Sequence, residues 1–475
     1  MAFTDIGANT LDDAYSISNS LRFNEPDDPQ LSITPSSAGN RRTWTVSFWH
    51  KVGKYNTYRY VFLSGASAPY DAVFITPDGG FALMLDLGSS GDPGLTSSAL
   101  CRDPSAWYHF VCALDTTQGT AANRIKLYIN GVQQTSFSAT NYPDQNSEFN
   151  TNNTVLQTVG GISAQEYVDG YVSEFFLIDG TAYAASDFGE FNDNGIWIPK
   201  DFTGSYGTNG FRLEFKQTGT SANASGIGAD TSGNDKHLAV SNLAATDVTT
   251  DTPTNNFCTM NPIDKSVGAS VNLPTFTEGN LKLALQQDAS ARGTIGLTSG
   301  KWYFEYNHSE NGSDNSGYPI VGITTSHGGQ AGNIIGFRTP DSTNYRGQKG
   351  TSSLDNVFLS AREAGDLFGF YIDLDNETLI VHKDGSTYMA SGYTSGIDWS
   401  SGLTTTDTQT GFFFPYVQNN ASSSMTDEFN FGNPSFSISS GNADANGYGN
   451  FEYSPTLSGT NYYAICTKNL AEFGG

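Results

Sequence analysis

The sequence predicts an all-β protein made of two β-sandwiches joined by an ordered connector. Aromatic residues make up 13% of the 475 residues, which is enough to fill hydrophobic cores. Apolar and polar residues alternate over many short stretches, and turn residues, above all the 52 glycines, separate these stretches at intervals of about ten residues. Such spacing is typical of strands in sandwiches and barrels, whereas helical periodicity is rare.

Residues 1–200 form the first predicted sandwich. In "RRTWTVSFWHKVG", Trp44 and Phe48 share one face of a strand. A second strand, "AWYHFVCALD", is followed by "RIKLYINGVQQT", where Asn130 and Gly131 make a tight turn because both residues tolerate positive φ. Together with "YVDGYVSEFFLIDG", these stretches resemble the laminin-G-like, concanavalin A-type jelly roll. The resemblance implies two packed antiparallel sheets.

Residues 201–262 differ in composition and are predicted to be a connector. They are rich in Thr, Ser, Asn, Gly and Ala. Apolar residues still recur in this segment, and "FRLEF" reads as a strand, so we interpret the connector as ordered.

Residues 263–440 form the second predicted sandwich. "LKLALQQ" favours a helix by propensity, but Leu281, Leu283 and Leu285 alternate strictly, and this pattern indicates a strand. The motifs "GKWYFE", "VGI", "GDLFGFYIDLD" and "FPY" follow in the order in which they occur in SPRY domains, which this segment resembles. The resemblance implies a second concanavalin A-like sandwich.

Three carboxylates lie close together in "GDLFGFYIDLDNETLIVHKDG", namely Asp373, Asp375 and Glu377. A calcium loop of the EF-hand type would need Gly where Thr378 stands and a bidentate Glu where Asp384 stands. The alternating flanks predict instead a β-hairpin with the acids at its bend. SPRY domains usually have Gly where this chain has Glu377, so the turn type stays open.

The tail, residues 441–475, is predicted to pack on a domain or a subunit, because an apolar stretch beyond a complete sandwich needs a partner surface. We expect it at an inter-domain or inter-subunit contact. "NNFCTMNP" and "YYAICTKNL" echo each other and suggest that Cys258 and Cys466 are neighbours. The four cysteines are widely spaced and form no CxxC motif, which favours buried thiols over a zinc site.

The composition excludes some functions. A formal charge of −25 repels nucleic acid, so no nucleic-acid partner is expected. The N-terminus lacks the basic and apolar regions of a secretory signal, and no apolar run of about 18 residues exists to insert into a membrane.

Catalytic motifs are also missing. None of the six histidines has metal-ligand spacing, and there is no G-x-S-x-G or phosphate-binding loop. The nearest matches to the E-x-D-x-x-E strand of jelly-roll glucanases are Glu174 with Asp179, at the wrong spacing, and the acids of the bend at 373–377. We therefore predict no catalytic residues, no metal, no cofactor and no enzyme activity.

Ligand binding is more consistent with the sequence than catalysis, because loop aromatics in such sandwiches stack on sugar rings. An alternative is that these aromatics close the core or an interface. The weak candidates are Tyr55, Tyr58, Tyr70, Asp71, Tyr345 and Arg346, with Tyr60 in the same segment as the first four.

"DTPTNNFCTMNP", the pairing of the two sandwiches and the ending "ICTKNLAEFG" resemble virion structural proteins of bacteriophages of marine bacteria. The resemblance implies a non-enzymatic fibre, decoration or adhesion component located in the virion. Its expected partners are other virion proteins, further copies of itself (a trimer is favoured) and a host surface glycan. The alternatives are a structural adaptor that binds only virion proteins and a polysaccharide-cleaving enzyme.

Overall fold

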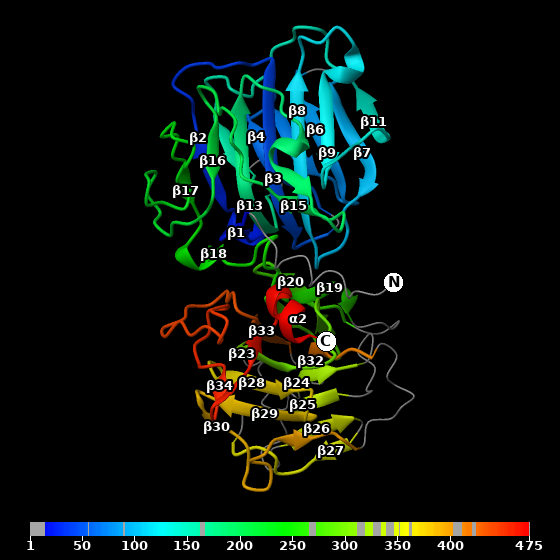
Figure 1. Cartoon of the computed structure of the whole chain (residues 1–475), viewed down its shortest axis with the longest axis vertical. Coiled ribbons are helices and arrows are strands. Elements are labelled where there is room, and N and C mark those ends of the chain that lie inside the picture. Colours follow the sequence, from blue (N-terminus) through cyan, green and yellow to red (C-terminus); the bar gives the residue numbers. More distant parts are fainter. Residues whose placement is uncertain are drawn as a thin grey trace. The chain divides into compact units, whose positions relative to one another are not determined.

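The computed structural model describes residues 15–474 apart from 56, 89–90, 162–166, 266–271, 311–318, 326–333, 339–345, 351, 361–362, 402–410 and 420–423. The chain divides into two compact units, and the boundary lies between Thr254 and Asn255 (Figure 1). Each unit is built from two large, mainly antiparallel sheets, so the predicted all-β class with two sandwiches is confirmed.

The first unit contains two eight-stranded sheets. Sheet I consists, in spatial order, of β10 (Val132–Gln133), β9 (Ile125–Ile129), β8 (Trp107–Asp115), β3 (Thr43–Val52), β13 (Gly170–Asp179), β1 (Ser20–Phe23) and β18 (Val248–Thr249), with β16 (Phe211–Leu213) also paired to β13. Sheet II consists of β11 (Phe137–Asn141), β7 (Gly94–Leu100), β6 (Gly80–Leu85), β5 (Asp71–Ile75), β4 (Arg59–Ser64), β12 (Gln157–Val159), β2 (Gln30–Ile33) and β17 (Ala239–Ser241).

The core of the first unit lies between sheets I and II. Trp44 and Phe48 of β3 are buried in it, as the alternation in the sequence predicts. Phe81 of β6 meets Phe48 from the opposite sheet with the ring centroids 6.2 Å apart. Alternate residues of each strand therefore form the interior, and the others form the two outer faces.

The boundary of the first unit differs from the predicted one. We expected a connector over 201–262, but the structure places 201–254 within the first unit, where β16 pairs with β13, β17 with β2 and β18 with β1. Phe211 and Leu238 are buried in the same core as Trp44. The polar residues that set this segment apart lie mainly in the long turns between its very short strands.

The outer face of sheet I is covered by the chain that follows β13. A hairpin of β14 (Gly189–Phe191) and β15 (Trp197–Pro199) lies in this segment (Figure 1). Phe188 and Phe202 stack with the ring centroids 4.9 Å apart and pack on Phe176 of β13.

The second unit also contains two sheets. Sheet III consists of β19 (Met260–Lys265), β22 (Ser290–Gly293), β32 (Phe414–Asn419), β24 (Pro319–Thr324), β25 (Ile334–Arg338), β26 (Arg346–Gly350) and β27 (Ser352–Leu354). Sheet IV consists of β20 (Thr275–Thr277), β21 (Lys282–Leu285), β33 (Met425–Asn430), β23 (Lys301–Glu310), β28 (Leu367–Asp373), β29 (Thr378–Lys383) and β30 (Ser386–Thr387), with β31 (Ile397–Asp398) beside β29 and β36 (Tyr463–Ala464) beside β23.

The core of the second unit confirms the predicted strand at "LKLALQQ". Leu281, Leu283 and Leu285 are all buried in it, and β21 pairs with β33. Burial of the leucines in a sheet outweighs their helix propensity. Phe304 and Phe370, from neighbouring strands, stack in the same core with the ring centroids 4.7 Å apart.

The hairpin predicted around the three carboxylates is confirmed by the pairing of β28 with β29. Asp373 forms an ion pair with Lys301 and accepts a hydrogen bond from the backbone N–H of Asn376 at 3.0 Å. Asp375 accepts one from the backbone N–H of Gly300 at 2.8 Å. Glu377 has φ of 52°, in the left-handed region that favours glycine. A glycine at this position would adopt the same conformation without steric strain.

Replacing Glu377 by Gly is expected to raise the free energy of unfolding of the second unit by about 0.5–1 kcal/mol. A non-glycine residue in the left-handed region costs roughly 1–2 kcal/mol, and the added freedom of glycine in the unfolded chain offsets part of the gain. Urea unfolding followed by fluorescence measures the difference. Glu377→Ala is the control, since it removes the same carboxylate but keeps the strain; equal stabilisation by both variants would contradict the prediction.

The tail packs on its own unit, which is one of the partners that the sequence allowed; the expected inter-domain or inter-subunit contact stays a prediction. It contains β34 (Thr456–Leu457), β35 (Thr460–Asn461), β36 and the helix α2 (Thr467–Phe473). β36 lies parallel to β23, and Tyr462 and Ala464 are buried against Tyr303 and Tyr371 on the outer face of sheet IV. Sheet IV carries aromatic residues on both faces, so its outer face needs this cover.

The two echoing segments lie side by side in the second unit, as their similarity suggested. Phe257 and Cys466 form an antiparallel bridge, and the backbone N–H of Cys258 donates to the carbonyl oxygen of Ile465 at 2.9 Å. Cys258 and Cys466 are neighbours, and both are buried cysteines that form no disulfide. Among the described residues, no helix is long and apolar enough to cross a lipid bilayer.

Candidate functional site

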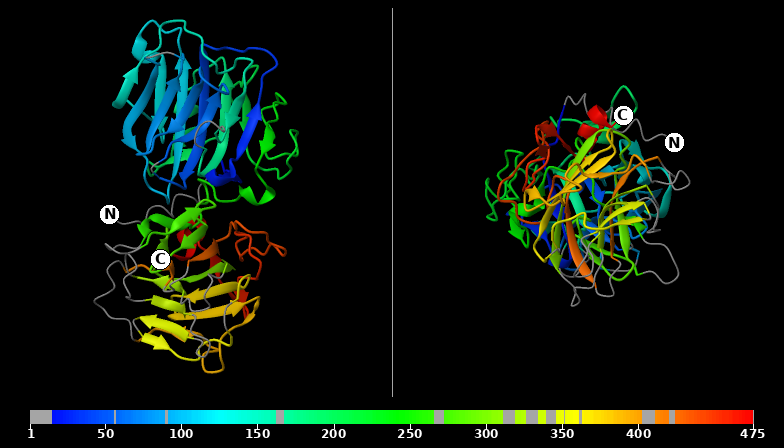
Figure 2. Two further views of the ribbon diagram at one scale, coloured as in Figure 1. Left: turned by 180° about the vertical axis from the view of Figure 1, so that it is seen from behind. Right: turned by 90° about the horizontal axis from the view of Figure 1, so that it is seen from below.

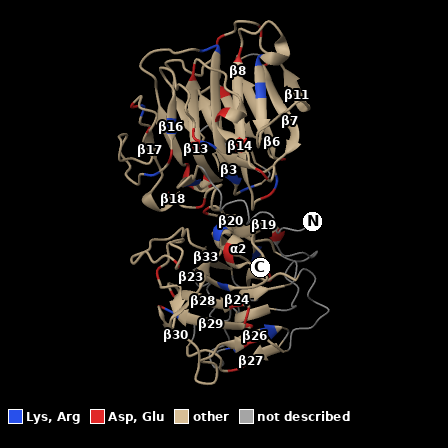
Figure 3. Cartoon of the chain, in the orientation of Figure 1, with Lys and Arg blue, Asp and Glu red and all other residues tan. Residues whose placement is uncertain are grey.

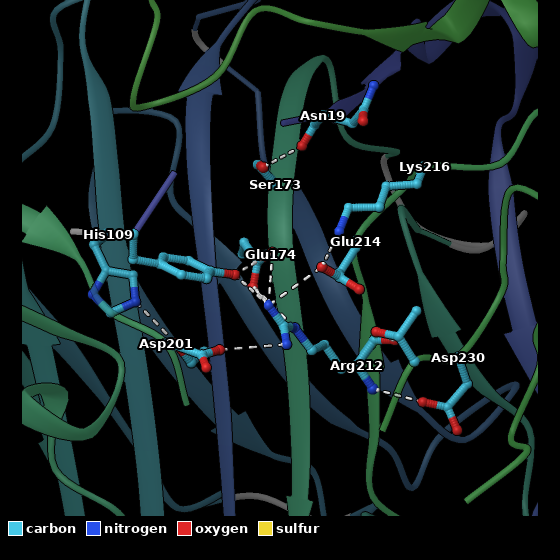
Figure 4. A network of polar contacts seen from close by, with 12 residues as sticks. Asn19, His109, Ser173, Glu174, Asp201, Arg212, Glu214, Lys216 and Asp230 are labelled. Carbon is cyan, nitrogen blue, oxygen red and sulfur yellow. Dashed lines mark hydrogen bonds and ion pairs between the residues drawn. The ribbon is translucent and has the colours of Figure 1, made fainter. Parts of the chain in front are cut away.

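Glu174, the first acid of the glucanase-like pair, lies on sheet I at a β-bulge between Ser173 and Phe176. It adopts a φ of 47° and is buried. Figure 4 shows that its carboxylate meets Arg212, whose Nη2 lies 3.0 Å from Oε2. The carboxylate also accepts a hydrogen bond from the hydroxyl of Tyr15 at 3.1 Å. The carboxylate therefore fastens the bulge of β13 to β16.

The electrostatics of this network are those of a buried ion pair. Burial raises the pKa of Glu174 to about 7, although Arg212 acts in the opposite direction. Burial lowers the pKa of Arg212, but the carboxylates of Glu174 and Glu214 act in the opposite direction, and the pKa is raised overall. The guanidinium therefore stays charged and holds Glu174 in place.

Asp179, the second acid, has a different environment. Its two carboxylate oxygens accept hydrogen bonds from the backbone N–H groups of Asn40 at 2.7 Å and Asn209 at 3.0 Å. Both acids of the pair are thus tied to neighbouring chain segments. In the part of the chain that the structure describes, no group of three or more His, Cys, Asp or Glu side chains could hold a metal ion.

His109 is a buried structural residue on the outer face of sheet I. The indole N–H of Trp197 donates to its Nδ1 at 3.1 Å, and its Nε2 lies 2.9 Å from the hydroxyl oxygen of Ser47. Because Nδ1 accepts a hydrogen bond, the ring is the neutral tautomer with its proton on Nε2. Burial lowers the pKa of His109 to about 3, so the ring stays neutral at physiological pH.

A cluster of aromatic side chains occupies the outer face of sheet II, and we call it the aromatic face. It consists of Tyr58, Tyr60 and Phe74, with Tyr70, Met84 and Leu156 at its margin. Tyr58 and Tyr60 stack with the ring centroids 6.0 Å apart, and Tyr60 and Phe74 approach to 5.1 Å. Tyr58 is 42% exposed.

Strand register explains how the aromatic face forms. Tyr60 is opposite Phe74, which is opposite Ala82 on β6. Residues directly opposite on antiparallel strands point to the same face, so two aromatic rings lie beside a small alanine. In the view from behind, no helix or further sheet of the described chain lies over strands β4 to β7 (Figure 2).

Few polar groups lie around the aromatic face. Thr158 of β12 lies on the same face, opposite Leu63, and its buried hydroxyl has no hydrogen-bond partner among the described residues. Burial raises the pKa of Tyr70, and so do the negative charges of Asp86 and Asp92. In the orientation of Figure 1, the Lys and Arg residues are spread over both units (Figure 3).

The structure separates the candidate ligand-binding residues of this segment. Tyr58 stacks on Tyr60 and Tyr70 packs at the margin, so both belong to the aromatic face. Tyr55 lies outside it and donates its hydroxyl to the carbonyl oxygen of Arg102 at 2.7 Å. Asp71 points to the opposite side of sheet II, where it is 1% exposed, so it is not available to a ligand on the aromatic face.

The remaining two candidates come from the second unit. Arg346 is the first residue of β26 and forms an ion pair with Asp355 at 2.8 Å. Tyr345 lies outside the described residues. Sequence reasoning missed Phe74. Its place on the aromatic face depends on the pairing of β5 with β4, which sets Phe74 opposite Tyr60.

Residues 26–185 match the family model described as the concanavalin A-like lectin/glucanases superfamily. This part of the first unit is a laminin-G-like jelly roll, as the sequence motifs suggested. No curated protein is significantly similar to the sequence.

Solved structures with a similar fold include three of different kinds. Domains LG4-5 of the mouse laminin α1 chain are 9% identical, with 96% of this chain and 90% of that chain covered and a TM-score of 0.30. The SPRY domain of human HERC1 is 15% identical, with 36% and 96% covered and a TM-score of 0.26. The CBM40 module of the Ruminococcus gnavus IT-sialidase, bound to α2,3-sialyllactose, is 16% identical, with 30% and 87% covered and a TM-score of 0.22.

Proposed function

We propose that this chain is a non-enzymatic adhesion component of a bacteriophage virion that binds host surface glycan on the aromatic face. The stacked and partly exposed ring of Tyr58 carries the proposal. A tyrosine offers a flat apolar surface and a polar hydroxyl, and the apolar side of a sugar ring packs on such a surface. The family match to a lectin and glucanase superfamily is consistent with a glycan ligand.

The character of the face favours a neutral glycan. Asp86 and Asp92 act on Tyr70 at the margin, and the whole chain carries a charge of −25. An anionic sugar would be repelled by this field, whereas a neutral one would meet the exposed ring of Tyr58 without this penalty.

The contacts of Glu174 and Asp179 support the non-enzymatic part of the proposal. Retaining and inverting glycosidases need two carboxyl groups free to act on the substrate. Glu174 is held by Arg212, and Asp179 is held by two backbone N–H groups. Release of reducing sugar from host polysaccharide by the purified chain would contradict this part.

Replacing Tyr58 by Ala is expected to weaken glycan binding about tenfold, which corresponds to about 1.4 kcal/mol. The loss of the exposed stacking surface is the reason, and the fold stays intact because Tyr60 and Phe74 remain. A glycan array identifies the ligand, and calorimetric titration measures the affinity. The matched control is Phe191→Ala, which removes a ring that is 54% exposed and lies on β14, outside sheet II. Equal losses in both variants would contradict the aromatic face as the site.

The virion part rests on the resemblance of "DTPTNNFCTMNP" and "ICTKNLAEFG" to phage structural proteins. Many copies on one particle would turn weak glycan contacts into firm attachment. Antibody against this chain should label intact virions in electron micrographs. Light scattering of the purified chain should give a mass above 50.9 kDa if it assembles with itself, a trimer being the favoured state.

A further inference from the structure

A lysine and an aspartate are buried together in an apolar cluster on the outer face of sheet I. Lys51 of β3 is opposite Trp107 on β8 and Tyr171 on β13. Residues directly opposite on antiparallel strands point to the same face, so Lys51 shares its face with two aromatic side chains. Its Nζ lies 5.6 Å from the ring centroid of Tyr171. Ile17 and Trp49 complete the apolar cluster.

Asp251 meets Lys51 from the last segment of the first unit. The Nζ of Lys51 donates to Oδ2 of Asp251 at 2.8 Å, and the indole N–H of Trp107 donates to Oδ1 at 3.1 Å. The backbone of Asp251 is fixed as well. Its carbonyl oxygen accepts a hydrogen bond from the hydroxyl of Ser20 at 2.6 Å, and its N–H donates to Oγ1 of Thr249 at 3.3 Å. The carboxyl group is therefore held against the amine.

Burial distinguishes this pair from other lysine ion pairs of the described chain. The side chains of Lys51 and Asp251 are each 1% exposed, whereas Lys301 is 25% and its partner Asp373 9% exposed. Water solvates a half-exposed pair. Removing both charges of a pair from water costs about as much as their attraction returns. An amide bond between the two side chains would remove both buried charges.

We propose that Lys51 and Asp251 join in an intramolecular isopeptide bond. One proton of the ammonium group passes to Oδ2, and the neutral amine nitrogen attacks Cγ of Asp251. The indole N–H of Trp107 stabilises the negative charge that develops on Oδ1. Oδ2 then leaves as water with two protons of the former ammonium group, and the amide nitrogen keeps the third. The new N–Cγ bond replaces the Cγ–Oδ2 bond, and no further reactant is consumed.

The bond would tie the final segment of the first unit to β3, a central strand of sheet I. The two residues are 200 positions apart in the chain. A covalent link between distant positions restricts the unfolded chain, and the effect grows with the length of the closed loop. This proposal does not depend on the glycan function, because the aromatic face belongs to sheet II.

Mass spectrometry of the full chain under denaturing conditions tests the bond. The wild type should have a mass lower than that of its sequence by one water molecule, and a protease digest should contain one branched peptide with Lys51 and Asp251. Lys51→Arg keeps the positive charge but has no amine, so it should show the full sequence mass. Asp251→Asn should lose ammonia instead of water and give the same branched peptide. Lys301→Arg, which changes the more exposed pair, is the control and should keep the deficit of one water.

Thermal unfolding gives a second measurement. The first unit of the wild type should melt on the order of 10 °C above that of Lys51→Arg, because the variant lacks the cross-link. A folded wild-type chain that keeps its full sequence mass after prolonged incubation would show that the pair is only an ion pair, and the proposal would be wrong. A mass deficit that remains in Lys51→Arg would also overturn it. The branched peptide of the wild type decides the question even if a variant does not fold.

Discussion

Deleting residues 456–475 is expected to abolish the cooperative unfolding transition of the second unit. The deletion removes β36, which pairs with Trp302 and Tyr303 of β23, and the helix α2. It also removes Ile465 from the main core of the unit. Burying one such apolar side chain is worth about 1.5–3 kcal/mol, and several are lost together. The sum is comparable to the roughly 5–15 kcal/mol that stabilises a typical domain.

The uncovered surface adds to this loss. Tyr303 and Tyr371 on the outer face of sheet IV would meet water once Tyr462 and Ala464 are gone. Differential scanning calorimetry should retain the transition of the first unit and lose that of the second. Thr460→Ala, an exposed site within the same tail, is the control and should leave both transitions unchanged.

A deletion variant with both transitions intact would contradict the packing of the tail on its own unit. If the deletion abolishes self-assembly while both units stay folded, the tail forms the contact between subunits that the sequence suggested. The two outcomes are separated by combining calorimetry with light scattering.

The stability of the first unit is expected to fall as the pH rises from about 5 to 8, because of Asp169. Asp169 is 2% exposed, and the backbone N–H of Glu25 donates to its Oδ2 over a long distance of 3.4 Å. Burial raises the pKa of Asp169 to about 7, and Glu25 raises it further, although that hydrogen bond and the charges of Lys54 and Arg59 act in the opposite direction.

The sign follows from proton binding. An unfolded aspartic acid titrates near pH 4, whereas the folded one titrates near pH 7. The folded state therefore holds a proton between these values that the unfolded state has lost, so stability is full below about pH 4 and is lost as the pH rises through 7. The loss from Asp169 between pH 5 and 8 is on the order of 3 kcal/mol.

Asp169→Asn isolates this contribution from the many surface carboxylates. The variant should be more stable than the wild type at pH 8, and the difference should vanish towards pH 5. Chemical unfolding at both pH values measures the two free energies. Asp193→Asn, at an exposed turn after β14, is the control and should follow the wild type at both values. A wild type and an Asp169→Asn variant with parallel pH profiles would contradict a protonated Asp169.

The candidate site could be predicted only in part. The sequence placed Tyr58, Tyr60 and Tyr70 in one aromatic segment, and the structure brings Tyr58 and Tyr60 together on the aromatic face. It assigned Asp71 to the same site because Asp71 follows Tyr70 directly. Successive residues of a strand point to opposite faces, so this adjacency in sequence separates Asp71 from any ligand on the aromatic face.

The sequence by itself determined the local structure of this protein. Alternation fixed the strands around Phe48, Leu283 and Phe370, because a sheet buried on one side needs an apolar residue at every second position. It also fixed the hairpin at Asp375. In these cases the deciding interactions lie within one strand or between neighbours in the chain.

Only the tertiary structure decided which surfaces face each other. A bulge between Tyr60 and Phe62 changes the alternation of β4, so that Tyr60 points outward while Phe62 is buried in the core. The same holds for the strands β16 to β18, which are too short to show a period and join the first unit only through pairing with distant partners. Contacts between residues far apart in the chain leave no periodic signal in the sequence, because their partners are chosen by the assembled sheets.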